Sequence, residues 1–193
     1  MRLSPLRLRL LLLRRRHAAS RLVRNEDGAA AVEFALVALP FLLFVLGILG
    51  MGLYFLASTS LEHGVEAAAR KLRTGEAEKG SMTVDSFREL VCTSAGSYID
   101  CGKVNTIVQH AATWSGITPQ ACTDDSGNRV GSTGSGGELI NKYSGSASEV
   151  VLVTVCYEWD LAQHFKFLKL GSGDGSGPAI IQAATAFKSE PYK

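Results

Sequence analysis

Residues 28–57, GAAAVEFALVALPFLLFVLGILGMGLYFLA, decide the fold class of this chain. From Phe34 to Ala57 no side chain carries a charge, and these 24 residues extend over about 36 Å as an α-helix. The hydrocarbon core of a bilayer is about 30 Å thick, so the length predicts a tilted membrane-spanning helix. A soluble helix that is apolar on every side would need a far larger protein around it. We therefore expect residues 34–57 to cross a membrane once.

Charge is divided unevenly around this apolar segment. Residues 1–28 carry eight arginines and two acids, a net charge of +6, whereas residues 29–193 carry 12 bases and 16 acids, a net charge of −4. Positive charge beside a span stays on the cytoplasmic side, so we expect the N-terminus in the cytoplasm and the later residues outside the inner membrane. A basic nucleic-acid-binding body is not expected, because the positive charge lies in the short arm. Mitochondrial transit and cleaved secretory signals both fit the segment poorly.

A single carboxylate, Glu33, lies five positions after Gly28, where the apolar segment begins. An acidic group inside a membrane costs about 2.5–3.5 kcal/mol at the centre of a helix and less near the interface, so it is a candidate functional residue. The alternative is that Glu33 lies among lipid headgroups and is solvated there. The position of Glu33 alone is compatible with both interpretations.

The residues around Glu33 carry a family resemblance. The stretch GAAAVEFALVALPFLLFVLGI from Gly28 resembles the processing site of type IV prepilins, and more narrowly the TadE-like minor pseudopilins of tight-adherence (Tad, Flp) pilus systems. A looser similarity covers VVLVTVCYEW (residues 150–159), AATAFKSEPY (residues 183–192) and a close cysteine pair. The glycine-rich residues 126–148 depart from the family pattern.

The resemblance implies a processing step and an assembly role. A membrane aspartyl prepilin peptidase would cut after Gly28 and make Ala29 the new N-terminus. Glu33, followed by Phe34, would pair with the N-terminal ammonium of a neighbouring subunit. The implied partners are the peptidase, a second, TadF-like minor pseudopilin, the Flp pilin and inner-membrane platform proteins. The implied protein is a non-enzymatic minor component that primes or tips a pilus.

These observations divide the chain into three parts. We expect a basic prepilin-type leader at residues 1–28, an N-terminal helix at 29–75 with the span at 34–57, and a periplasmic α+β domain at 76–193. The protein would be a single-pass inner-membrane protein or would reach the pilus. One alternative is an unprocessed, signal-anchored periplasmic protein that binds a ligand or an envelope partner. Another is an envelope enzyme, although the common catalytic motifs are absent and we expect no catalytic residue, metal or cofactor.

Hydrophobic periodicity predicts the elements of the domain. The helix continues to about residue 74, with an apolar stripe at Leu61, Val65, Ala68 and Leu72, an i,i+4 ion pair of Glu66 with Arg70, and Gly75 as terminator. A short helix at 84–92 is capped by Thr83. Strands are expected at 104–114, 150–159 and 179–188, whereas residues 161–170 are ambiguous between strand and helical turn. Flexible Gly/Ser loops are expected at 126–137, 144–148 and 171–177. The result is a small α+β domain with a meander-like antiparallel sheet.

Small residues and a proline interrupt the apolar segment. Pro40 lies inside the predicted helix, where it either kinks the helix for function or bends it without consequence. Gly47, Gly50 and Gly52 form a small-residue face that weakly suggests close contact with another helix, although no G-x-x-x-G is present.

All four cysteines, Cys92, Cys101, Cys122 and Cys156, follow the span. An oxidising compartment predicts two disulfides, and four cysteines allow three pairings. The resemblance implies a Cys92–Cys101 pair, which leaves Cys122 with Cys156. A zinc site is disfavoured, because the spacings of 9, 21 and 34 positions do not fit C-x2–4-C. Residues 124–128 resemble a calcium loop only faintly, with its glycine and glutamate misplaced.

Overall fold

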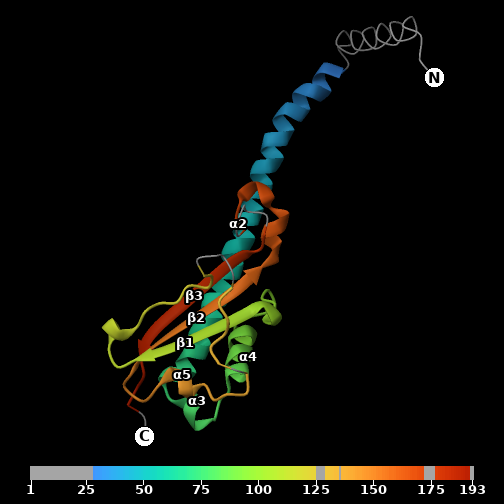
Figure 1. The fold of residues 1–193 in the computed structure, drawn as a ribbon. Coiled ribbons are helices and arrows are strands. Elements are labelled where there is room, and N and C mark those ends of the chain that lie inside the picture. Colours follow the sequence, from blue (N-terminus) through green and yellow to red (C-terminus); the bar gives the residue numbers. More distant parts are fainter. Residues whose placement is uncertain (1–27, 125–128, 135, 172–176, 192–193) are drawn as a thin grey trace, which may run out of the picture. The chain divides into compact units, whose positions relative to one another are not determined.

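A computed structural model describes residues 28–124, 129–134, 136–171 and 177–191 (Figure 1). The predicted leader up to residue 27, most of the faint calcium-loop pattern and parts of two predicted Gly/Ser loops lie outside the described residues. The chain forms two compact units, residues 1–48 and 49–193, which we describe separately. The fold class is α+β, as predicted: a long N-terminal helix, then a small three-stranded antiparallel sheet with two disulfides.

The first unit consists, in its described part, of the beginning of helix α2 (Ala29–Arg73). No residue from 28 to 48 is buried, and all of the large apolar side chains there except the half-buried Val45 are exposed. Helix α2 is long and apolar enough to cross a membrane. Pro40 lies inside it without ending it.

The second unit begins with the remainder of α2, whose apolar stripe enters the core. Leu61, Val65, Ala68 and Leu72 are all buried, as the periodicity predicted. Gly75 adopts the left-handed conformation at φ 73° and its N–H donates to the Leu72 carbonyl, so the helix ends where glycine was expected to stop it. A four-residue turn of helix, α3 (Glu76–Lys79), follows.

The predicted ion pair between Glu66 and Arg70 is wrong. Both side chains are exposed, and no ion pair joins them in the described part of the chain. An exposed i,i+4 pair gains only a few tenths of a kcal/mol, which is small against the entropy of ordering two long side chains.

Helix α4 (Val84–Ala95) packs against α2. Thr83 caps it, since its Oγ1 accepts from Ser86 N–H at 3.2 Å while Ser86 Oγ accepts from Thr83 N–H at 2.8 Å. The cap was predicted; the helix is three residues longer than predicted. At Gly64 of α2, a Cβ would lie 2.4 Å from the Val91 carbonyl oxygen of α4, so the two helices meet backbone to backbone.

The sheet has the order β1 (Val104–Ala111), β2 (Val150–Trp159), β3 (Ala179–Lys188), and both pairs are antiparallel. The bounds of β2 and β3 match the prediction. The predicted end of the first strand is wrong, because the ladder stops where Ala111 pairs with Val150, the first residue of β2. Trp114 instead begins an exposed 3-10 turn, η3 (Trp114–Gly116).

The central strand β2 is buried on both faces, which explains its nearly continuous apolar sequence. On one face Val153, Val155 and Trp159 join the main core with α2 and α4. On the other face Cys156 packs with Ile107 and Cys122 in a smaller cluster. The sheet is thus covered on both sides at its centre.

The connections between strands are longer than those of a simple meander. The β1–β2 connection contains η3 and helix α5 (Asn141–Ser144). Most of the ambiguous residues 161–170 lie in two 3-10 turns, η4 (Asp160–His164) and η5 (Lys166–Leu168), and none is in a strand. The second of these packs on Gly50, where a Cβ would lie 2.9 Å from Leu168 Cδ1. The small-residue face had suggested close contact with another helix. At Gly50 the close contact is instead with the η5 region of the same chain.

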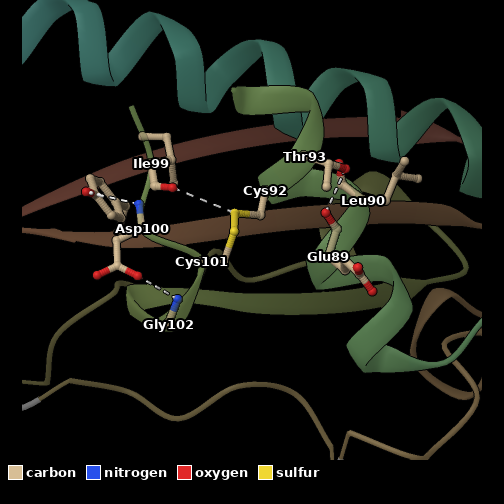
Figure 2. The surroundings of a disulfide bond; sticks show 9 residues. Glu89, Leu90, Cys92, Thr93, Ile99, Asp100, Cys101 and Gly102 are labelled. Atoms are coloured by element: carbon tan, nitrogen blue, oxygen red, sulfur yellow. Dashed lines mark hydrogen bonds between the residues drawn. A yellow bond between two sulfur atoms is a disulfide. The ribbon is translucent and has the colours of Figure 1, made fainter. Parts of the chain in front are cut away.

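Two disulfides brace this unit, with the pairing that the resemblance implied. Cys92 of α4 is joined to Cys101 in the turn η2 (Cys101–Lys103) before β1, with Cα atoms 5.5 Å apart (Figure 2). Cys122 of the long connection is joined to Cys156 of β2, with Cα atoms 5.6 Å apart. Asp100 accepts the Gly102 N–H beside the first bridge and donates its own N–H to the Tyr157 hydroxyl, so the turn is fixed from both sides.

Removing Cys122–Cys156 is expected to destabilise the protein more than removing Cys92–Cys101. The two cysteines are 34 positions apart in Cys122–Cys156 and 9 positions apart in Cys92–Cys101, and a longer closed loop of the unfolded chain loses more entropy when it is cross-linked. The difference is expected to be about 1 kcal/mol. Chemical denaturation of the two double cysteine-to-alanine variants measures it, and an equal or inverse effect would contradict this expectation.

Candidate functional site

The candidate site is the beginning of α2, where the sequence placed Gly28, Ala29, Glu33 and Phe34. Gly28 immediately precedes the helix and is exposed, and a Cβ built on it would meet no atom within 4 Å. Ala29 is the first residue of the helix and is exposed as well. In the described part of the chain, no side chain shields the peptide bond that joins them.

The helix brings Ala29 and Glu33 onto one face. Residues at i and i+4 lie above one another, one turn of about 6 Å apart. The first turn of α2 carries no acidic residue, so Glu33 is the first acidic residue of the helix itself, after Glu26 and Asp27 of the preceding leader sequence. The amide groups at a helix start carry partial positive charge without intrahelical acceptors. A carboxylate on this face is therefore well placed to interact with a cation at the end of the helix.

Glu33 is exposed, and it has no hydrogen-bond or ion-pair partner among the residues that the structure describes. Phe34 beside it is 75% exposed. The exposed apolar side chains that surround Glu33 and continue along the unit are Val32, Leu36, Val37, Leu39, Phe41, Leu42, Leu43, Phe44, Leu46 and Ile48. Glu33 is thus an unpaired acid on a surface that suits lipid or other apolar helices.

The part of α2 that contains no buried residue is about as long as the hydrocarbon core of a bilayer is thick. Ala29–Ile48 is 20 residues and extends over about 30 Å. Further along the helix Gly50 and Ala57 are buried, and the Tyr54 ring packs edge-on against Trp159 with centroids 5.7 Å apart. The globular unit therefore begins inside the segment 34–57 that hydropathy alone selected.

The structure brings the cysteines together in pairs, but as parts of the folded unit rather than of this site. The unpaired charges of Glu66 and Arg70, which sequence reasoning treated as a surface pair, line a groove beside β3. The i,i+4 spacing of Glu66 and Arg70 is visible in the sequence. The sequence does not show that both side chains line a groove, because the groove depends on where β3 lies in the fold.

The chain thus combines a helix that is long and apolar enough to cross a membrane, a lone acid near the start of that helix, and a disulfide-braced α+β domain. Residues 28–70 match the family model of TadE-like proteins, which confirms the resemblance for this segment. The match associates the chain with a Tad pilus system and with a family of structural or assembly components rather than a known enzyme family. Neither the curated proteins nor the solved structures contain a match to this chain.

Proposed function

We propose that this chain is a minor pseudopilin of a Tad (Flp) system, processed by a prepilin peptidase after Gly28. The observation that carries the proposal is that the family match begins at Gly28 itself and includes Glu33. The exposed Gly28–Ala29 bond and the unpaired Glu33 carboxylate support it. The protein would prime or tip the pilus at the inner membrane without catalysing a reaction.

We also propose a refined membrane position, with the span at 29–48 and the domain in the periplasm. This range contains the unburied part of α2 and leaves Gly50 to the folded unit. The eight arginines of the leader favour a cytoplasmic N-terminus, and two disulfides favour an oxidising compartment for residues 76–193. Processing would then create the mature N-terminus at the edge of the bilayer, one turn from Glu33.

The proposed partners follow from this role. They are the prepilin peptidase, a TadF-like second minor pseudopilin, the Flp pilin and the inner-membrane platform. The pairing of Glu33 with the ammonium of a neighbouring subunit would remove two uncompensated charges from the apolar region at once. Such pairing would favour one register between neighbouring helices.

Co-expression with a prepilin peptidase is expected to yield a mature chain that begins at Ala29. The exposed bond and the prepilin-like residues around it supply the physical reason. Intact mass and N-terminal sequencing measure the loss of residues 1–28. Gly28→Leu places a large side chain next to the scissile bond and is expected to leave the chain unprocessed, with Gly52→Leu as a control that keeps the junction intact. A chain that still begins at Met1, or that begins after Ala57, would instead support the unprocessed or signal-cleaved alternatives.

A further inference from the structure

The two edges of the sheet differ in how they are covered. At the β1 edge, Thr133 N–H donates to the Thr106 carbonyl at 2.9 Å, and Val108 N–H donates to Thr133 Oγ1 at 2.9 Å. At the β3 edge, no residue that the structure describes pairs with the outer side of the strand (Figure 1). In the described part of the chain, the sheet is therefore closed on one side and open on the other.

Strand β3 carries little of the protection that is normal for an open edge, since its one charged residue is the exposed Lys188 at its last position. From Ala179 to Phe187 (AIIQAATAF) it contains no charge and no proline, and its pairing with β2 is continuous without a bulge. An open edge of this kind is a template for a further strand. Ser189 N–H donates to the Glu149 carbonyl, so the alternation of the ladder directs the N–H and C=O groups of even-numbered residues such as Ala184 outward.

An open groove of about 310 Å³ runs beside the second half of this edge. Thr185 and Phe187 of β3 form one wall, and Glu66, Arg70 and Arg73 of α2 contribute to the other. The side chains of Glu66 and Arg70 have no ion-pair or hydrogen-bond partner among the described residues. The groove therefore presents the Glu66 carboxylate and the Arg70 guanidinium, which together with the hydrogen-bonding Lys71 also helps to lower the pKa of nearby Glu76, next to unpaired backbone groups. The third charged group of the lining, Arg73, is already ion-paired with Glu190.

Strand β3 runs alongside α2 in the same direction. Near its start, Trp159, which pairs with Ala179, packs against Tyr54 of α2. Just after its end, Glu190 N–H donates to the Arg73 carbonyl at 2.9 Å. Strand β3 therefore lies alongside residues 54–73 of α2, and the two elements run in the same direction.

Because β3 and α2 run side by side, the separation of Glu66 and Arg70 along the helix can be compared with the spacing of alternate side chains in an added strand. Glu66 and Arg70 are separated by about 6.0 Å along the helix, at 1.5 Å per residue. Two residues of a strand on the same face are about 6.6 Å apart. A strand added to β3 would therefore bring side chains i and i+2 to these two charges.

We propose that the β3 edge binds an extended segment of a partner protein as a fourth, antiparallel strand. The segment would carry an acidic residue for Arg70 and, two residues later, a basic residue for Glu66. A second copy of this chain does not supply that pattern through β3, since the one charge of the strand is Lys188 and the residue two positions before it is Ala186. The inference concerns residues 49–193 and is independent of processing after Gly28.

Binding of synthetic peptides to the full chain in detergent micelles tests the charge pattern. The probes are ten-residue Thr/Val peptides with Glu-x-Lys or, at the same composition, Lys-x-Glu at the centre, followed by fluorescence anisotropy. We expect the Glu-x-Lys peptide to bind at least about tenfold more tightly, because an antiparallel strand forms both charge-assisted hydrogen bonds only in that order. Tighter binding of Lys-x-Glu would indicate a parallel strand and would overturn the proposal. Exchanging the charges, E66R with R70E, should reverse the preference.

A variant at Ala184 tests the backbone pairing. Ala184→Pro removes an outward N–H without removing a bond to β2, and it is expected to weaken Glu-x-Lys binding at least about tenfold. Ala184→Val keeps the N–H and should bind as the wild type does, with circular dichroism confirming that both variants are folded. The proposal is overturned by absent binding, by equal affinity for both peptides, or by unchanged affinity in Ala184→Pro. Self-association of the full chain that Ala184→Pro abolishes would show a second copy as the occupant and would overturn it too.

Discussion

Gly64→Ala is expected to lower the free energy of unfolding by about 2 kcal/mol or more, the upper part of the range for overpacking. The new Cβ would lie 2.4 Å from the Val91 carbonyl oxygen and 2.8 Å from Ala95 Cβ, distances that force α2 and α4 apart. Glycine to alanine within a helix normally gains up to about 1 kcal/mol from propensity, which opposes the loss without cancelling it. The backbone carbonyl has no rotamer with which to move away, so the whole of α4 must shift.

Denaturant unfolding followed by circular dichroism measures this effect, with Gly52→Ala as the matched control. Gly52 is in the same helix, and a Cβ there would meet no atom within 4 Å. We expect the control to be as stable as the wild type or more stable. If Gly64→Ala were as stable as Gly52→Ala, the close approach of the two helices would be refuted.

Strands β2 and β3 were predictable because their signals are local. Val150–Trp159 is a run of β-branched and aromatic residues, and Ala179–Lys188 follows a glycine-rich stretch of sequence. The end of β1 was not predictable in the same way. Trp114 has a high strand propensity, but β1 ends at Ala111 because its partner β2 begins at Val150. Strand length here depends on a residue about forty positions away.

The 3-10 turns and the groove depend even more on distant contacts. Residues 161–170 have no clear period, and their turn conformation accompanies the packing of Phe165 and Leu168 on Gly50, more than a hundred positions earlier. Likewise, Glu66 and Arg70 line a groove only because the fold places β3 beside them, and the sequence around these two residues does not predict that. The position of Glu33 one turn after the start of α2 was predictable, because it depends only on local helix geometry. The roles of Gly28 in processing and of Glu33 in assembly stay predictions.

Glu33→Gln is expected to reduce incorporation of the protein into pili at least about tenfold, while membrane insertion and processing stay intact. A neutral amide has almost the shape of the carboxylate but cannot neutralise an ammonium group of a neighbouring subunit. An uncompensated charge at this depth costs on the order of 2.5–3.5 kcal/mol at most, and 1.4 kcal/mol corresponds to a factor of ten. Insertion is preserved because the substitution makes the segment less charged.

Immunoblots of sheared pili and of membranes from the same cells separate assembly from insertion. Ala30→Gln is the matched control, since it adds the same amide to the exposed first turn and leaves the carboxylate in place. Glu33→Asp keeps the charge on a shorter side chain and should retain part of the incorporation. Equal incorporation of Glu33→Gln would mean that the carboxylate is solvated at the membrane surface. That result would remove the proposed role of Glu33 in joining subunits, and the chain would be better described as an anchored periplasmic domain.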